Sequence, residues 1–117
     1  MDLASLCELC LGLKGVEETT PFGPDTLVFK VGGKCFALMS PDEFPPRVNL
    51  KCDPARAEEL RGEYPAVRPG YHMNKKHWNT VILDGSLPAA LVRELVLHSH
   101  QLVVKGLTAA ARNAAGL

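Results

Sequence analysis

The sequence has no long hydrophobic run and no excess of charge of either sign. No apolar stretch approaches the roughly 20 residues that a membrane-spanning helix needs. Thirteen Lys and Arg side chains balance thirteen Asp and Glu side chains, which excludes a histone-like polycation and an acidic tail. The start of the chain, MDLASLCELC, lacks the basic region of a secretory signal. We therefore expect a cytoplasmic protein without a membrane segment.

The chain also lacks the motifs of common catalytic and metal sites. No G-x-S-x-G, phosphate-binding P-loop or H-E-x-x-H motif occurs. Cys7 and Cys10 lie on the apolar stripe of a predicted helix that no strand precedes, so we expect core packing rather than redox chemistry. His98 and His100 point to different sides of a predicted helix, one partly buried and one solvated. We expect no catalytic residue, no cofactor, no metal site and no enzymatic activity.

The residues that are present fit one globular domain over residues 1–117. The apolar fraction of 46% is ordinary for a soluble chain of this length. Two apolar runs flank Gly32 and Gly33, which predicts a β-hairpin over 27–31 and 34–39, because glycine tolerates the positive φ of tight turns. If Val31 pairs with Lys34, strict alternation divides the hairpin into two faces. The apolar face then holds Leu27, Phe29, Val31, Phe36 and Leu38, and the opposite face holds Val28, Lys30, Cys35, Ala37 and Met39.

The remaining pattern predicts helices at both ends of an antiparallel sheet. Asp53 and Ser86 are the expected caps of the second and third helices, and Pro54 suits the first helical position. Helices are expected over 2–14, from 54 to about 62–65 and over 87–105, with a frayed turn in 108–117; further strands are expected at 47–51 and 77–83, and a short one between 16 and 20. This order predicts an α+β sandwich with the terminal helices packed on one face of the sheet.

The positive charge is concentrated in residues 66–83. This segment holds Arg68, Lys75 and Lys76 and no acidic residue, whereas residues 1–65 hold seven basic and eleven acidic side chains. Aromatic and amide side chains lie between these cations, a mixture that suits a nucleic-acid surface. Pro69 and Gly70 favour a turn, so the basic residues are expected on a loop that projects like a wing.

The string PGYHMNKKHWNTV, residues 69–81, resembles the signature of the bacterial MmcQ/YjbR family. PFG at 21–23, NLKC at 49–52 and Ser99-x-x-Leu102-Val103 match in order. The resemblance implies a CyaY/frataxin-like fold and DNA binding with a double-wing arrangement. It makes Tyr71, His72, Asn74, Lys75, Lys76, His77, Trp78 and Asn79 the leading DNA contacts. Lys30, Lys34, Arg47 and Lys51 are additional contacts suggested by the charge pattern.

Three alternatives stay open at this stage. The same loop and an open sheet face could recognise a partner protein, because Trp, Tyr and cations also form protein-binding hot spots. A small-molecule site or enzyme would use His72 or His77 as a base and would need a deep pocket beside both. Iron binding, suggested by the frataxin-like fold, has little support, since Asp2 and Glu8 are the acidic residues of the first helical region.

Overall fold

The computed structural model describes residues 1–70 and 73–117. Its strands are β1 (Val16–Thr19), β2 (Leu27–Val31), β3 (Lys34–Met39), β4 (Arg47–Lys51), β5 (Val67–Pro69) and β6 (Trp78–Ile82). Its helices are α1 (Leu3–Leu11), α2 (Pro54–Glu63), α3 (Ala89–Lys105) and α4 (Ala109–Ala114). Within these parts of the chain, no helix is long and apolar enough to cross a membrane.

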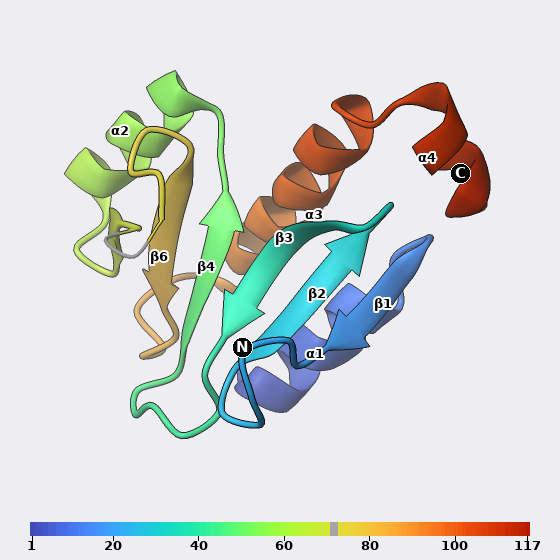
Figure 1. Ribbon diagram of the computed structural model, residues 1–117. Helices are drawn as coiled ribbons and strands as arrows, with labels where there is room; N and C mark the ends of the chain where they lie inside the picture. The colour runs from blue at the N-terminus through green and yellow to red at the C-terminus, as the bar shows by residue number, and fades with distance from the viewer. Residues whose placement is uncertain (71–72) are drawn as a thin grey trace.

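The six strands form one antiparallel sheet in the order β1-β2-β3-β4-β6-β5, with α1 and α3 on one face (Figure 1). The core lies between this face and the helices, and α2 adds Ala57 and Leu60 to it. The predicted α+β sandwich with an antiparallel sheet is therefore confirmed. β5 was not predicted from the sequence, because a three-residue strand that ends at Pro69 carries almost no alternation.

The β2–β3 hairpin turns at Gly32 and Gly33, whose φ angles are +60° and +80°, as the Gly-Gly pattern predicts. The pairing of its two strands departs from the strict alternation of side chains that the sequence analysis assumed. Val31 pairs with Lys34, but Lys30 pairs with Cys35 and Phe29 pairs with Ala37, so Phe36 is an additional residue in β3. This β-bulge reverses the facing of the rest of the strand.

The bulge corrects the predicted division of faces. Ala37 and Met39 are 0% and 1% exposed in the core, where the alternation placed Leu38. Leu38 is half-buried and pairs with Asn49 on the other face. Sequence alternation cannot find such a bulge, because residues 34–39 contain no glycine or proline to mark it.

Only some of the helices begin and end where the sequence signals predicted. Asp53 caps α2 by accepting the amide hydrogen of Arg56, as expected. α1 ends at Leu11 rather than near residue 14, with Gly12 after it. Ser86 does not cap α3: its hydroxyl bonds the Asp84 carboxylate at 2.6 Å, and the helix begins after Pro88.

Ser99 of α3 joins β3 to β4 where the two strands separate. The ladder between them covers Ala37 to Met39, and Figure 1 shows the strands diverging beyond it. The buried Ser99 hydroxyl accepts the amide hydrogen of Lys51 at 2.9 Å and donates to the carbonyl oxygen of Phe36 at 2.6 Å. One side chain thereby satisfies two backbone groups that the sheet leaves unpaired.

Candidate functional site

The loop between β5 and β6, residues 70–77, carries most of the leading predicted contacts. Tyr71 and His72 lie outside the described residues, so this site is built from Gly70 and residues 73–77. Gly70 donates its amide hydrogen to the carbonyl oxygen of Trp78 at 3.0 Å. A side chain at position 70 would start 3.0 Å from the Cβ atom of Trp78, a tight contact that favours glycine there.

Asn74 shapes the second half of the β5–β6 loop. Its side-chain oxygen accepts the amide hydrogen of Lys76 at 3.0 Å, and its carbonyl oxygen accepts those of His77 and Trp78. This is the side-chain-closed turn that Asn favours. Asn74, Lys75 and Lys76 are exposed, so the turn holds both lysines at the surface of the molecule.

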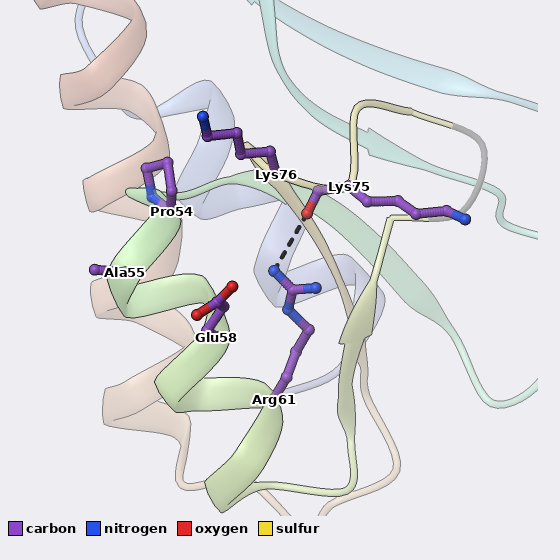
Figure 2. A pocket seen from close by; sticks show the side chains of 6 residues that line it. All are labelled: Pro54, Ala55, Glu58, Arg61, Lys75 and Lys76. Atoms are coloured by element: carbon purple, nitrogen blue, oxygen red, sulfur yellow. Dashed lines mark hydrogen bonds between the residues drawn. The ribbon is translucent and has the colours of Figure 1, made fainter.

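The two lysines border a hollow of about 400 Å³ between the β5–β6 loop and α2 (Figure 2). Arg61 of α2 donates to the carbonyl oxygens of Lys75, at 3.2 Å, and Ala57, at 3.1 Å, and so ties the loop to the helix. Figure 2 shows the Lys76 side chain running toward Pro54, whereas that of Lys75 runs the opposite way. The lining is Pro54, Ala55, Glu58, Arg61, Lys75 and Lys76, and the charged ends of Arg61 and Lys76 share the hollow with the Glu58 carboxylate, while that of Lys75 points away.

The sheet face opposite the helices adjoins this loop and is called the open face below. The strand register assigns its residues, since directly paired positions share a face. One row of directly paired residues crosses the sheet on this face. The pair of Trp78 in β6 and Lys51 in β4 lies next to this row. The row consists of Thr19, Val28, Leu38, Asn49, Thr80 and Arg68. The Thr80 hydroxyl and the Asn49 side-chain oxygen are 2.6 Å apart at its centre.

The open face gathers three of the predicted additional contacts. Arg47 and Lys51 lie on it two positions either side of Asn49, and Lys30 lies on it at the hairpin end of β2, where it pairs with Cys35. Trp78 is half-buried and lies outside the hydrophobic core cluster, which agrees with its place on this face. Lys34 is exposed at the start of the hairpin, which Figure 1 shows on the opposite side of the molecule from the β5–β6 loop. The structure therefore does not bring Lys34 to the site.

Asn79 is a correction to the predicted contacts. It is 2% exposed, pairs with Leu50, and its amide nitrogen donates to the carbonyl oxygen of Ala57 at 3.4 Å. Because strand residues alternate between faces, the residue after Trp78 points toward α2. Asn79 therefore helps to hold α2 against the sheet and has no access to a ligand.

The histidines do not assemble a catalytic site among the described residues. His77 is half-buried, and the described hollow beside the β5–β6 loop does not include it; His72 lies outside the described residues. His98 accepts the amide hydrogen of Asp53 at 3.2 Å through Nε2. Burial lowers the pKa of His98, and the nearby Arg56 guanidinium acts in the same direction.

His100 is less solvated than its predicted place on the helix implied. Its ring meets the buried Phe36 ring edge-on, with centroids 5.2 Å apart, and its Nε2 lies 3.1 Å from the carbonyl oxygen of Lys14. The side chain of a histidine is long enough to reach back over the sheet edge from the flank of the buried stripe. His100 thus packs between α3 and the end of α1.

The cysteines are packing residues, as predicted. Cys10 is fully buried in the core, and burial raises its pKa to about 12. Cys7 packs beside it with its sulfur 3.6 Å from that of Met39. Thiols with raised pKa values carry little thiolate at neutral pH. Within residues 1–70 and 73–117, no cluster of three or more His, Cys, Asp or Glu side chains is arranged to hold a metal ion.

Two cations of the site were not among the predicted contacts. Arg61 lies four residues after the buried Ala57, and that helical spacing is the signal that places it on the side of α2 facing the sheet edge. Arg68 was counted in the basic segment, but its position opposite Thr80 depends on β5, which sequence reasoning missed.

A different surface feature lies at the other ends of the strands. Phe22, in the β1–β2 loop, is 74% exposed, and Phe44, in the β3–β4 loop, is 94% exposed. Figure 1 shows both loops at the end of the sheet away from the β5–β6 loop. Asp25, Asp42 and Glu43 accompany them, and these two loops contain no Lys or Arg. This end of the molecule is thus acidic and aromatic.

Comparison with known proteins gives consistent matches along the chain. The model of the YjbR family matches residues 11–102. The uncharacterized protein YbdF of Escherichia coli O157:H7 is 47% identical over 111 residues, which cover 92% of this chain and 91% of YbdF. The uncharacterized protein YjbR of Escherichia coli K12 is 38% identical over 104 residues, which cover 89% of this chain and 88% of YjbR.

Solved structures share the architecture. The crystal structure of the Deinococcus radiodurans protein DR2400 matches with a TM-score of 0.91 at 47% identity, covering 99% of this chain and 88% of that chain. The crystal structure of a Pseudomonas syringae protein matches with a TM-score of 0.76 at 29% identity, covering 87% of this chain and 98% of that chain. The overall fold of this chain is therefore shared by these two solved proteins.

Proposed function

Since the chain belongs to the YjbR family, we propose that it is a non-enzymatic DNA-binding protein that contacts phosphate groups with Lys75 and Lys76 of the β5–β6 loop. The observation that carries this proposal is the exposure of both lysines on a turn beside a hollow that Arg61 also lines. Cations on a projecting loop reach a phosphate backbone without a change of fold. In the double-wing arrangement, this loop is one wing.

The distribution of positive charge favours a negatively charged partner such as DNA over an uncharged partner. Lys51 and Arg47 extend the positive charge from the β5–β6 loop along the open face, although the chain as a whole is neutral. Phosphate contacts of this number give weak binding that falls steeply with salt. The proposal includes a cytoplasmic location, because bacterial DNA lies there.

The test is fluorescence anisotropy of a labelled duplex DNA at two salt concentrations. We expect Lys75→Ala/Lys76→Ala to weaken binding at least tenfold at low salt and to flatten the slope of log affinity against log salt by about 0.9 for each lost contact. Lys14→Ala/Lys105→Ala is the matched control, since it removes two exposed charges from other elements. Equal affinity of the first double variant and the wild type would disprove the proposed contact.

A protein-binding role is the second candidate, and the exposed Phe22 and Phe44 favour it. Isolated aromatic side chains at such exposure are typical anchors of protein interfaces. An adaptor that used the β5–β6 loop and the open face would bind its partner with little dependence on salt, whereas DNA binding depends on it strongly. Phe22→Ser/Phe44→Ser leaves the β5–β6 loop intact, so loss of a partner protein without loss of DNA affinity would separate the two roles.

We further propose that the sheet and helices are of the CyaY/frataxin type. An antiparallel sheet covered on one face by α1 and α3 supports this assignment. Superposition of an experimental structure on a frataxin, with matching strand order β1-β2-β3-β4-β6-β5, is the test. An iron-binding role does not follow from it, because a shared fold does not carry a shared site.

A further inference from the structure

The open face presents a half-buried aromatic ring among cations, directly beside the β5–β6 loop. Trp78 pairs with Lys51 across β6 and β4, and Arg47 lies on the same face at the other end of β4, where it pairs with Ile82. Trp78 is the one tryptophan of the chain. Its backbone is held by the hydrogen bond to Gly70 and by the β6 ladder, so the indole stands on a rigid strand.

The charges of this face favour an anionic occupant. Its strand positions include four cations, and the acidic residue placed there by the register is Glu17, which pairs with Lys30. The pKa of the Asp84 carboxyl is lowered mainly by its hydrogen bonds with Ser86, and Arg68 acts weakly in the same direction. The four cations are Lys30, Arg47, Lys51 and Arg68.

The aromatic side chain on this face favours a single strand over a duplex. Side chains on an antiparallel sheet stand roughly perpendicular to it, so the indole of Trp78 projects from the sheet on the open face. The bases of a duplex are stacked on one another and cannot reach such a ring, whereas the unstacked bases of a single strand can. Stacking on an aromatic side chain combined with backbone contacts by cations is the usual mode of single-strand binding.

We propose that the open face binds single-stranded nucleic acid, with one base stacked on Trp78, the adjacent phosphate bound by Lys51 and a phosphate farther along the strand bound by Arg47. This inference rests on the proposed function, and it adds the class of nucleic acid and the surface used. Asn49 and Thr80, at the centre of the row, hydrogen-bond to one another, and Trp78 lies two residues before Thr80 on the same face.

The experiment titrates the protein with a labelled single-stranded oligonucleotide of about ten nucleotides, and separately with a hairpin duplex. Anisotropy reports binding, and the intrinsic emission reports stacking on Trp78 alone, because no other tryptophan contributes. We expect the single strand to quench this emission and to bind more tightly than the duplex. Trp78→Ala should weaken single-strand binding roughly tenfold or more, and Trp78→Phe should retain most of it.

Two further variants keep the test decisive. Lys51→Glu leaves the indole in place and should reduce both affinity and quenching, which covers the case in which Trp78→Ala fails to fold. Phe44→Ala is the matched control, since it removes an exposed ring from the other end of the sheet and should change neither signal. Far-UV circular dichroism verifies the fold of each variant.

The outcomes distinguish this inference from the proposed function. Duplex binding that depends on Lys75 and Lys76, without quenching and without an effect of Trp78→Ala, would overturn the inference and leave the proposed function standing. Absence of binding to either oligonucleotide at low salt would overturn both. Quenching by the single strand that Lys51→Glu abolishes would establish the open face as the binding surface.

Discussion

At the scale of single residues, two buried or half-buried polar side chains of α3 hold the region beneath the site. Ser99 bridges β3 and β4, and His98 accepts a hydrogen bond from the chain just before α2. Ser99 accepts the amide hydrogen of Lys51 and His98 accepts that of Asp53, so both side chains hold the segment that leads from β4 into α2. The lysines of the β5–β6 loop reach their positions only if this segment is fixed, because α2 forms the other wall of the hollow.

We expect Ser99→Ala to lower the free energy of unfolding by about 1–3 kcal/mol, because it leaves two backbone groups without their partner. Urea denaturation followed by circular dichroism measures the change. Ser86→Ala is the control: Ser86 bonds to Asp84 on an exposed turn, so its loss should stay within about 0.5 kcal/mol. A loss of about 1 kcal/mol at Ser86 would instead support the helix cap that the sequence pattern suggested.

His98 makes the stability depend on pH in a defined direction. Its folded pKa is lowered, first by burial, so the unfolded chain, with a histidine pKa of about 6.5, binds more protons between the two values. The free energy of unfolding therefore falls as the pH drops through about 6.5, and this fall ends below the folded pKa. Charging Nε2 also ends its role as an acceptor for Asp53.

Urea denaturation between about pH 5 and 8 measures this dependence. In His98→Gln, we expect the part of the slope due to His98 to disappear, since glutamine keeps an acceptor and cannot be charged. Other histidines remain in that variant as an internal reference. The same dependence of the free energy of unfolding on pH in the wild type and in His98→Gln would contradict the assignment to His98.

At the scale of elements, the bulge in β3 decides which side chains fill the core. Phe36 is the additional residue of the bulge. The consecutive residues Phe36 and Ala37 are therefore both buried, and Met39 also points into the core. Adjacent buried residues in one strand are the outcome of the bulge, because an extra residue shifts the alternation by one. Leu38 consequently joins Asn49 on the open face.

A pair of alanine variants distinguishes the two registers. We expect Met39→Ala to cost about 2–5 kcal/mol in the free energy of unfolding, as is usual for a buried methionine. Leu38→Ala should cost about 1 kcal/mol or less, since a half-buried side chain outside the core leaves no cavity. Strict alternation gives the opposite ranking, so chemical denaturation of the two variants decides between them.

At the scale of the whole molecule, a formally neutral chain carries local regions of one charge sign. The loops of Phe22 and Phe44 hold Asp25, Asp42 and Glu43 and no Lys or Arg, whereas residues 66–83 hold three cations and no acidic residue. The local positive charge favours an anionic partner at the β5–β6 loop although the formal net charge is zero. The core beneath is apolar and includes Cys10 and Cys52 as packing groups.

Stability is therefore expected to need neither metal nor disulfide. The thermal midpoint should be the same with and without EDTA, and with and without a reductant, because the cysteines of the described chain are free thiols and no metal-binding cluster occurs among its described residues. Differential scanning fluorimetry makes the measurement. A midpoint that drops on chelation would show that a bound ion contributes to folding.

Sequence patterns predicted most of the elements because their signals are local. The Gly32–Gly33 turn, the Asp53–Pro54 helix start and the alternation in Arg47–Lys51 each depend on neighbouring residues, and the structure confirms them. The concentration of cations in residues 66–83 is also a local feature. The exposure of Lys75 and Lys76 agrees with the predicted loop.

Pairing and packing between distant segments decided the rest. Whether Phe36 is an additional residue depends on β2, whether Asn79 is buried depends on α2, and whether Arg61 reaches the β5–β6 loop depends on how α2 lies on the sheet. The open face itself exists only after six strands pair and the helices gather on the other side. No local pattern encodes such contacts, since their energy comes from residues that meet only in the folded chain.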